Sequence, residues 1–364
     1  MKLHSLFAVV LAGGSGTRFW PRSRQNKPKQ LCKITDAKQT MLEQTLRRLD
    51  GFIPVENRMI VTHAFQEAET RHITSHLCKN ILSEPLARNT SAALALAVLQ
   101  LRLLGYGEDT VMCSLHSDHL VKDVKAFQKT LQAAAQIARE GYLCLVGIVP
   151  RSPETGFGYI KKGSALAKTA FKVETFKEKP DLKTAKSYLQ TGDYVWNSGM
   201  FVWTLRLISE EFKKYLPELW SPLFKKFEEL REKKKTFLDL SSEELLTLYK
   251  QVPEIAIDNG ILEKSEKCAV IAGEFEWNDV GTWTALTEVF PTDAEGNLIQ
   301  GQVIPCQTNG SILMSDGLTL ATYGVQDLIV VVENGCVLVC PKDKAQGIKE
   351  IVAKLKEKGL KDLI

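Results

Sequence analysis

A glycine-rich segment near the start of the chain has the composition of a phosphate-binding loop. Gly13, Gly14 and Gly16 directly follow an apolar run over residues 6–12, and Arg18 and Lys29 supply cations after them. Glycines let backbone N–H groups surround a phosphate chain, and the two cations can bond its oxygens. The segment therefore predicts an anionic ligand, with an ordinary turn as the alternative for such a loop taken alone.

The residues that follow these glycines argue against the two common phosphate-binding loops. A Walker A loop ends in Gly-Lys-Ser/Thr, whereas this one reads Gly16-Thr17-Arg18. A dinucleotide fingerprint that starts at Gly14 would need its third glycine at position 19, which holds Phe19. Asp36 lies near the position expected of a ribose-binding acid, so an NAD-dependent oxidoreductase stays open as a weaker alternative.

Two aspartates follow strand-like segments and are candidates for metal binding. Asp118 comes after an apolar segment at 111–115, and Asp279 lies between a strand-like run at 269–272 and a helix expected from Thr282. Ligands of open α/β sheets lie beyond the carboxyl ends of the strands, which favours both positions. Each residue also has an ordinary alternative, Asp118 as a turn residue and Asp279 as the N-cap of the helix.

The elements that position these residues read as an α/β domain. Between residues 5 and 290, short apolar runs alternate with helical patterns, which is typical of a mainly parallel sheet with helices on both faces. Thr40 and Glu43 form a capping box for one helix, and a helix over 91–104 is apolar nearly all round, which predicts that it is buried.

The pattern changes after Pro291 to short runs separated by turn residues at 295–297, 309–310, 316–317 and 334–335. These are hairpin-type or coil turns between short strands. We therefore expect a first domain over 1–290 and a small β-strand domain over 291–364, closed by a helix at about 342–358. The second domain is expected to pack on the first or to mediate self-association.

Composition narrows the class of protein. Of 364 residues, 47 are Lys or Arg and 43 are Asp or Glu, and this balance of +4 is too weak for a nucleic-acid-binding surface. No apolar run is long enough for a membrane span, and Lys2 with the run at 6–12 only imitates a signal peptide. The eight cysteines have no zinc-site spacing and are expected to be buried free thiols, so the cytoplasm is the expected location.

Seven blocks, in order over about 270 residues, resemble those of sugar-nucleotide pyrophosphorylases, and specifically of mannose-1-phosphate guanylyltransferases. They are LAGGSGTR (11–18) with PKQ (28–30), EP (84–85) with RNT (88–90), SDH (117–119), PETGFGYI (153–160), FKEKP (176–180), WNSGMF (196–201) and WNDVG (277–281). The resemblance implies a three-layer α/β/α nucleotide-diphospho-sugar transferase fold, Rossmann-like, with a mainly parallel mixed sheet and a small C-terminal β-domain.

The resemblance also implies a reaction and a role for each matched residue. The reaction joins GTP and mannose 1-phosphate into GDP-mannose and pyrophosphate. The catalytic residues would be Arg18, Lys29 and Lys179; the metal ligands for Mg²⁺, with Mn²⁺ as an option, would be Asp118 and Asp279. The nucleotide-binding residues would be Ala12, Gly13, Gly14, Gly16, Thr17, Glu84, Arg88, Asn89 and Thr90; the sugar-binding residues would be Gly158, Glu178 and Asn197.

Several of these residues have simpler interpretations. Glu84 is a candidate reader of the guanine edge, because two acceptor oxygens complement its two donors, or it only caps the loop before Pro85. Glu178 and Lys179 could be an exposed strand end before the turn at Pro180. Gly158 would let the backbone approach the hexose, or it marks an ordinary loop.

Other functions remain open at this point. They are the same chemistry with another hexose 1-phosphate or nucleotide, and a non-catalytic regulator that binds a nucleotide sugar. Asn259 stands where the family usually has Tyr, so a nearby packing or sugar contact stays open at this point. Longer relatives carry a phosphomannose isomerase domain, for which a chain ending at Ile364 has no room, so we expect the transferase activity alone. We expect no nucleic-acid or membrane partner, and a homodimer is a candidate assembly.

Overall fold

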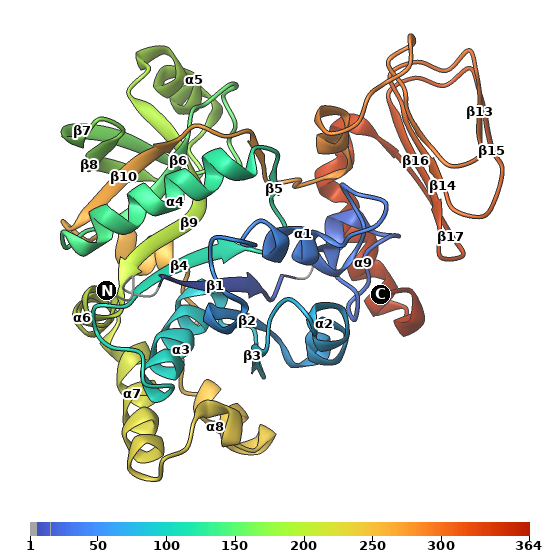
Figure 1. Cartoon of the computed structure of the whole chain (residues 1–364). Coiled ribbons are helices and arrows are strands. Elements are labelled where there is room, and N and C mark those ends of the chain that lie inside the picture. Colours follow the sequence, from blue (N-terminus) through green and yellow to red (C-terminus); the bar gives the residue numbers. More distant parts are fainter. Residues whose placement is uncertain (1–5, 15) are drawn as a thin grey trace.

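The computed structural model describes residues 6–14 and 16–364, so Lys2 and Ser15 lie outside the described residues (Figure 1). A nine-stranded sheet has the order β3-β2-β1-β4-β9-β6-β10-β8-β7. Its strands are β1 (Leu6–Ala12), β2 (Arg58–His63), β3 (Asn80–Glu84), β4 (Val111–His116), β6 (Leu143–Ile148), β7 (Tyr159–Ala167), β8 (Ala170–Lys177), β9 (Tyr194–Thr204) and β10 (Cys268–Gly273). The pairings make seven of these strands run in one direction and only β8 and β9 in the other. The predicted mainly parallel mixed sheet is confirmed.

Helices cover both faces of this sheet, which gives three layers. Alternate residues of β1 enter different cores: Phe7 and Val9 join one, and Ala8 and Val10 the other. The first core receives α3 (Asn89–Leu103), α6 (Leu205–Tyr215), α7 (Pro217–Glu232) and α8 (Ser242–Tyr249). The second is lined by α1 (Met41–Arg47), α4 (Val124–Arg139) and one residue of α5 (Leu182–Thr191), with α2 (Glu67–Thr74) at the same end.

The helix signals in the sequence are confirmed at two positions. Thr40 and Glu43 make the reciprocal bonds of a capping box at the start of α1. α3 is buried on almost every side, as its uniform apolar composition predicts. Asp36 accepts the backbone N–H groups of Lys38 and Gln39 within a turn before α1, which is the ordinary local role of an aspartate.

The C-terminal part is a β-helix-like coil (Figure 1). Its strands are β12 (Leu298–Gln300), β13 (Val303–Cys306), β14 (Ile312–Ser315), β15 (Leu320–Tyr323), β16 (Leu328–Glu333) and β17 (Cys336–Pro341), followed by α9 (Ile348–Glu357). β12, β14 and β16 pair in parallel, as do β13 and β15, while β17 returns antiparallel on β16. The turns at 309–310 and 316–317 are therefore coil turns, and the turn at 334–335 is a hairpin.

This coil packs on the segment that follows the glycine-rich loop, as expected of the second domain. The indole Nε1 of Trp20 donates to the carbonyl of Leu363 at 2.8 Å, and Arg22 pairs with Glu333 at 2.6 Å. Phe19 is fully buried in a core that it shares with Ile312 and Ile329 of the coil, and its ring centroid lies 5.0 Å from that of Trp283. Position 19 therefore serves the interface between the two parts, which explains why it is not the third glycine of a dinucleotide loop.

One cysteine is not buried, contrary to expectation. All eight cysteines are free thiols and seven are buried, but Cys306 is exposed. Cys306 ends β13, whose side chains point alternately into the coil and out to solvent, and its position in that alternation directs it outward. Among the described residues, no helix has the length and apolar character of a membrane span.

Candidate functional site

The glycine-rich loop follows β1 and is pressed against the backbone of Lys29. Gly16 has φ +57°, and a Cβ placed on it would lie 2.4 Å from the backbone nitrogen of Lys29. Only glycine combines that conformation with that approach. The hydroxyl of Ser23 donates to the carbonyl of Gly16 at 2.7 Å. The loop is therefore fixed at Gly16 by its contacts with Ser23 and Lys29.

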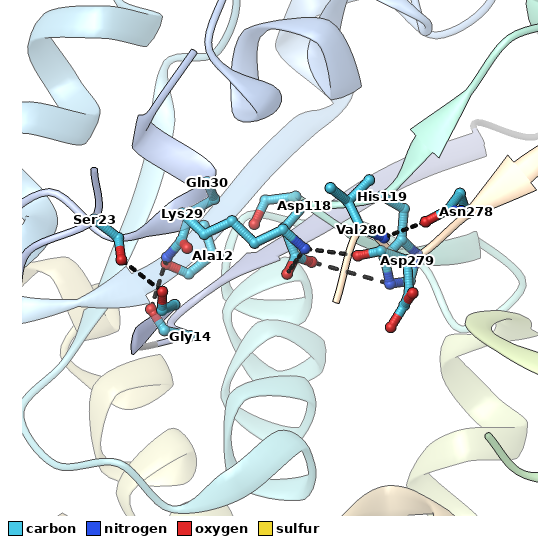
Figure 2. A network of polar contacts seen from close by, with 12 residues as sticks. Ala12, Gly14, Ser23, Lys29, Gln30, Asp118, His119, Asn278, Asp279 and Val280 are labelled. Carbon is cyan, nitrogen blue, oxygen red and sulfur yellow. Dashed lines mark hydrogen bonds and ion pairs between the residues drawn. The ribbon is translucent and has the colours of Figure 1, made fainter. Parts of the chain in front are cut away.

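Gln30 holds the inner side of this loop, a role that the sequence reasoning did not assign to it. Its side-chain amide donates to the carbonyls of Ala12 at 2.8 Å and Gly14 at 3.0 Å (Figure 2). Thr62 of β2 donates to the same carbonyl of Ala12 at 3.1 Å. The carbonyls of Ala12 and Gly14 thus accept their hydrogen bonds on the inner side of the loop, while Gly13 and Gly14 stay exposed at the mouth of a cavity.

That cavity, of about 260 Å³, brings together most of the residues predicted to bind the nucleotide. Its lining includes Gly13, Gly14, Glu84, Arg88, Asn89, Thr90, His116 and Asp118. Thr17 lines a neighbouring hollow together with Gly13, and Ala12 is buried at the end of β1. The loop, the end of β3 and the start of α3 thus form one wall around a space open to a ligand.

Glu84 lies in this wall at the end of β3 and is buried. The hydroxyl of Tyr249 donates to its Oε1 at 3.2 Å, so its side chain is held by Tyr249 and not by the loop before Pro85. Burial raises the pKa of Glu84 to about 8, although the bond from Tyr249 acts in the opposite direction. A buried carboxyl group with one weak partner is well suited to accept further hydrogen bonds from a ligand.

The first residues of α3 also hold the wall together. Arg88 donates from Nε to the carbonyl of Tyr249 at 3.2 Å, and the hydroxyl of Thr90 accepts the N–H of Ile257 at 2.9 Å. Asn89 has φ +62°, in the left-handed region that Asn tolerates better than most residues. These three residues line the cavity, and Arg88 and Thr90 also anchor the chain around 249–257.

Lys29 lies at the centre of the site, between the two predicted metal-binding loops. Its Nζ donates to Oδ2 of Asp118 at 3.0 Å and to the backbone carbonyl of Asp279 at 2.6 Å (Figure 2). Only 5% of Lys29 is exposed. Burial alone would raise the pKa of Asp118, but the charge and the hydrogen bond of Lys29 hold it well below its ordinary value. Asp118 is therefore ionised.

Two short strands bring the loops of Asp118 and Asp279 together. β5 (Leu120–Val121) pairs with β11 (Trp277–Asn278), so the two aspartates flank the same small ladder. Burial raises the pKa of Asp279, which Lys29 partly offsets and the charge of Asp118 reinforces. The N-cap interpretation of Asp279 is wrong, because the N-cap of the following 3-10 turn is Thr282.

Buried residues of α1 and β11 support the Asp118 loop from behind. Arg48, which is 6% exposed, donates to the carbonyl of His119 at 2.6 Å, and Thr45 donates to the carbonyl of Ser117 at 3.3 Å. Trp277 donates to Nδ1 of His119 at 3.2 Å. The sequence gives no signal for this role of Arg48, because Arg48 resembles any other charged residue of a helix.

The donor atoms around Asp118 fit a divalent cation. Ligand atoms of His116, Asp118 and His119 lie within 4.8 Å of one another, and burial lowers the pKa of both imidazoles, so they are neutral. Asp118 already forms an ion pair with the ammonium of Lys29, and the side chain of Asp118 is 33% exposed. A carboxylate that is ionised and partly exposed is a ligand of the kind that a hard cation such as Mg²⁺ prefers.

The predicted sugar-binding residues meet at the ends of β7, β8 and β9. A Cβ on Gly158 would lie 2.4 Å from Oε2 of Glu178 and 3.2 Å from Cβ of Asn197. Oε2 of Glu178 is buried and has no hydrogen-bond partner among the described residues, while Oε1 lies 3.1 Å from Nζ of Lys179. An orphaned carboxylate oxygen beside a glycine marks a place that a ligand hydroxyl can fill.

A second cleft, of about 790 Å³, lies beside this cluster and extends to the acidic centre. Its lining includes Arg18, Thr155, Lys179, Trp196, Trp277 and Asp279. Arg18 is exposed, and Lys179, with φ +44°, is bent out of the line of β8. The site therefore has a glycine-lined cavity on one side, a cleft lined by Arg18, Arg151 and Lys179 on the other, and Lys29 with two aspartate loops between them. Such an arrangement can align two phosphate-bearing molecules and neutralise their charge.

Family sequence models match both parts of the chain. A model described as nucleotidyl transferase matches residues 7–296. One described as a MannoseP isomerase/GMP-like beta-helix domain matches residues 301–355. The two matches fall on the sheet domain and on the coil, in agreement with the described architecture.

Individual relatives match nearly the whole chain. A mannose-1-phosphate guanylyltransferase of Escherichia coli is 35% identical over 363 residues, which is 98% of this chain and 77% of the relative. Mannose-1-phosphate guanylyltransferase ManC of Salmonella typhimurium is 36% identical over 367 residues, 99% of this chain and 75% of the relative. A crystal structure from Thermus thermophilus, described as a "mannose-1-phosphate geranyltransferase", superposes with a TM-score of 0.85 at 34% identity, over 97% of this chain and 99% of that one.

Proposed function

Because the chain belongs to the nucleotidyl transferase family, and within it to the mannose-1-phosphate guanylyltransferases, we propose that it makes GDP-mannose and pyrophosphate from GTP and mannose 1-phosphate. The observation that carries the proposal is the position of Lys29. Its ammonium joins the two aspartate loops between a glycine-lined cavity and a cleft that carries Arg18 and Lys179. A nucleotidyl transfer needs such a meeting point between a triphosphate and a sugar phosphate.

The roles of the residues follow from the charges that the reaction moves. The glycine-rich loop binds the triphosphate through its backbone, while Arg18 and Lys29 stabilise the departing pyrophosphate. Lys179 orients the phosphate of the sugar. That phosphate attacks the α-phosphorus of GTP, and with a second pKa near 6 it is already largely dianionic at pH 7. No general base is needed, so His116 and His119 serve as neutral neighbours of Asp118.

Asp118 and Asp279 would hold the metal ion in this proposal, with Mg²⁺ as the first candidate and Mn²⁺ as the second. A bound divalent ion supplies charge neutralisation between the two phosphate groups. Glu84 would accept the two donors of the guanine edge, next to Arg88, Asn89 and Thr90 in the cavity wall.

The substrate pair is tested by a matrix of nucleoside triphosphates against hexose 1-phosphates, with pyrophosphate release as the readout and with or without divalent metal. We expect the highest kcat/KM for GTP with mannose 1-phosphate. A higher value for another pair would favour the same chemistry on other substrates. Binding of GDP-mannose without any turnover would favour the non-catalytic regulator.

The metal assignment is tested by Asp118→Asn, which keeps the shape of the side chain. Loss of one charged contact in the transition state costs about 3 kcal/mol, so kcat should fall about a hundredfold while circular dichroism stays unchanged. Asp109→Asn is the matched control, since Asp109 is exposed and pairs with Arg206 at the surface. Near-normal turnover of Asp118→Asn with Mg²⁺ present would contradict the assignment.

Three further expectations belong to this proposal. The catalytic domain would end near residue 290 and the small β-domain would follow to residue 364. A homodimer is a candidate assembly, because the coil exposes Val337, Val339 and Tyr323. The seven buried free thiols support a reducing compartment such as the cytoplasm.

A further inference from the structure

Asp258 lies beside the sugar-binding cluster, and none of the roles described so far belongs to it. Nδ2 of Asn197 donates to Oδ1 of Asp258 at 2.8 Å, and Oδ1 of Asn197 accepts the N–H of Gly199 at 3.0 Å. These two bonds fix the orientation of the amide. The carboxylate of Glu178 is close enough to interact with Asp258 electrostatically. Two carboxyl groups and one oriented amide thus surround the same point.

The backbone holds Asp258 firmly at this point. It starts a π-helical turn over Asp258–Leu262, and the preceding N–H, of Ile257, donates to the hydroxyl of Thr90 at 2.9 Å. A Cβ on Gly260 would lie 2.8 Å from Leu216, so the turn is packed tightly onto the core. Single π-helical turns are frequent at functional sites because they re-aim one side chain. Here the turn starts at the nucleotide wall and directs Asp258 to Asn197.

The carboxyl group of Glu178 has an oxygen without a partner in the described part of the chain, and that of Asp258 is bonded by Asn197 at Oδ1. Oε2 of Glu178 is buried without a hydrogen-bond partner in that part of the chain and is packed against Gly158, where a Cβ would lie only 2.4 Å from it. Burial, reinforced by the charge of Glu178, raises the pKa of Asp258 to about 6, while Asn197 and Lys179 act in the opposite direction. Lys179 bonds Oε1 of Glu178 and leaves Oε2 unpaired. A ligand that offers several hydroxyl groups, each both donor and acceptor, would complete these bonds.

We infer that Asp258 is a sugar-binding residue which, with Glu178 and Asn197, bonds adjacent hydroxyl groups of the hexose. The inference rests on the proposed function, because it requires a hexose phosphate in this cleft. A site built to bond particular hydroxyl groups discriminates strongly against a sugar that presents one of them differently, since its own buried groups are then left unpaired. Asp258 therefore contributes to the choice between hexoses as well as to affinity.

The test compares Asp258→Ala and Asp258→Asn with Asn259→Ala. Asn259 is the neighbouring residue, and its amide bonds Glu263 at 3.1 Å, away from the sugar cluster. For Asp258→Ala we expect the KM for mannose 1-phosphate to rise by about tenfold or more, while the KM for GTP stays within about twofold. The ratio of kcat/KM for mannose 1-phosphate over glucose 1-phosphate should fall in the same variant. Asn259→Ala should change none of these by more than about twofold.

Asp258→Asn keeps the size of the side chain and its acceptor for Asn197, so it separates folding from recognition. Its melting temperature should match that of the parent, and its KM for mannose 1-phosphate should lie between those of the parent and Asp258→Ala. If Asp258→Ala does not fold, Asp258→Asn gives the deciding KM.

Two results would overturn the inference. One is an unchanged KM for mannose 1-phosphate in the folded variants, and the other is an equal rise of both KM values together with a lower melting temperature, which indicates a structural role. A parent that binds no mannose 1-phosphate or glucose 1-phosphate in calorimetry would refute the proposed function as well. An active parent with unaffected variants would refute this inference alone.

Discussion

Replacing Lys29 by methionine removes the ammonium group from the centre of the site and keeps an unbranched side chain of similar length. In the parent, Nζ of Lys29 bonds Oδ2 of Asp118 at 3.0 Å and the carbonyl of Asp279 at 2.6 Å. Lys29→Met leaves the ionised Asp118 without its cation and leaves this carbonyl without its donor. We therefore expect a less stable protein in the absence of ligands.

The size of this loss follows from the exposure of the partners. Hydrogen bonds to charged groups contribute about 1.5–3 kcal/mol each when they are buried. The side chain of Lys29 is 6% exposed but that of Asp118 is 33% exposed, so water replaces part of the lost partner. We expect the free energy of unfolding to fall by about 2 kcal/mol, or roughly 3 °C in melting temperature for a chain of 364 residues.

The pH dependence of this loss has a definite sign. Because the folded-state pKa of Asp118 is held well below its ordinary value, the ion pair contributes its full stability above about pH 4 and loses it as the pH falls further. The difference between parent and Lys29→Met should therefore be constant from about pH 5 to 8. It should shrink only in acid, where Asp118 takes up a proton in both proteins.

The assay is urea unfolding of the parent, Lys29→Met and Lys27→Met, each with and without Mg²⁺. Lys27 is exposed in the same segment, so its variant should stay within about 0.5 kcal/mol of the parent. The ammonium and a divalent cation would compete for Asp118, so Mg²⁺ should stabilise Lys29→Met more than the parent. Turnover of Lys29→Met should fall about a hundredfold. Equal unfolding midpoints for all three proteins, with equal shifts on adding Mg²⁺, would refute this reasoning.

Two other variants test the walls of the site. Burial raises the pKa of Glu84 to about 8, so the free energy of unfolding of the ligand-free parent should fall as the pH rises from about 4.5 toward 8. Glu84→Gln should flatten this dependence and lower the preference for GTP over ATP and UTP by about tenfold; an unchanged preference would contradict the guanine-reading role. Gly158→Ala places a methyl group 2.4 Å from Oε2 of Glu178, so the KM for mannose 1-phosphate should rise by about tenfold with the KM for GTP unchanged. Gly107→Ala, where a Cβ meets no atom of the described chain within 4 Å, should behave as the parent, and an equally mild effect of Gly158→Ala would show that Glu178 has room to move.

Local signals in the sequence predicted most of the large domain. The strand at 6–12 reads as a fully buried run because its alternate residues enter two different cores. The capping box of Thr40 and Glu43 and the uniformly apolar α3 are likewise decided by residues close in the chain. The predicted site residues come together because the family blocks mostly follow the ends of strands, where a parallel sheet collects its loops.

Contacts between distant residues could not be read from the chain. Lys29 bonds partners 89 and 250 positions away, and nothing in the local sequence indicates that its ammonium lies between the aspartate loops. In the sequence Asp258 resembles any other acidic residue, and only the structure shows that Asn197 bonds it. In the coil, an Asn-Gly turn can either join two antiparallel strands or lead on to the next strand of a parallel coil. Only the pairing of β14 with β16, which are distant in the chain, decides between these two arrangements.

The contact of the coil with the segment after the glycine-rich loop matters for chimaeras built from two such proteins. Trp20 and Arg22 bond Leu363 and Glu333, so residues more than 300 positions away hold the segment that follows the glycine-rich loop. The predicted sugar-binding residues Gly158, Glu178 and Asn197 belong instead to the sheet domain, although Gln346 of the C-terminal part lines the cleft beside them. Grafting the C-terminal module of one homologue onto the sheet domain of another should therefore alter how tightly the nucleotide is held more than it alters sugar preference.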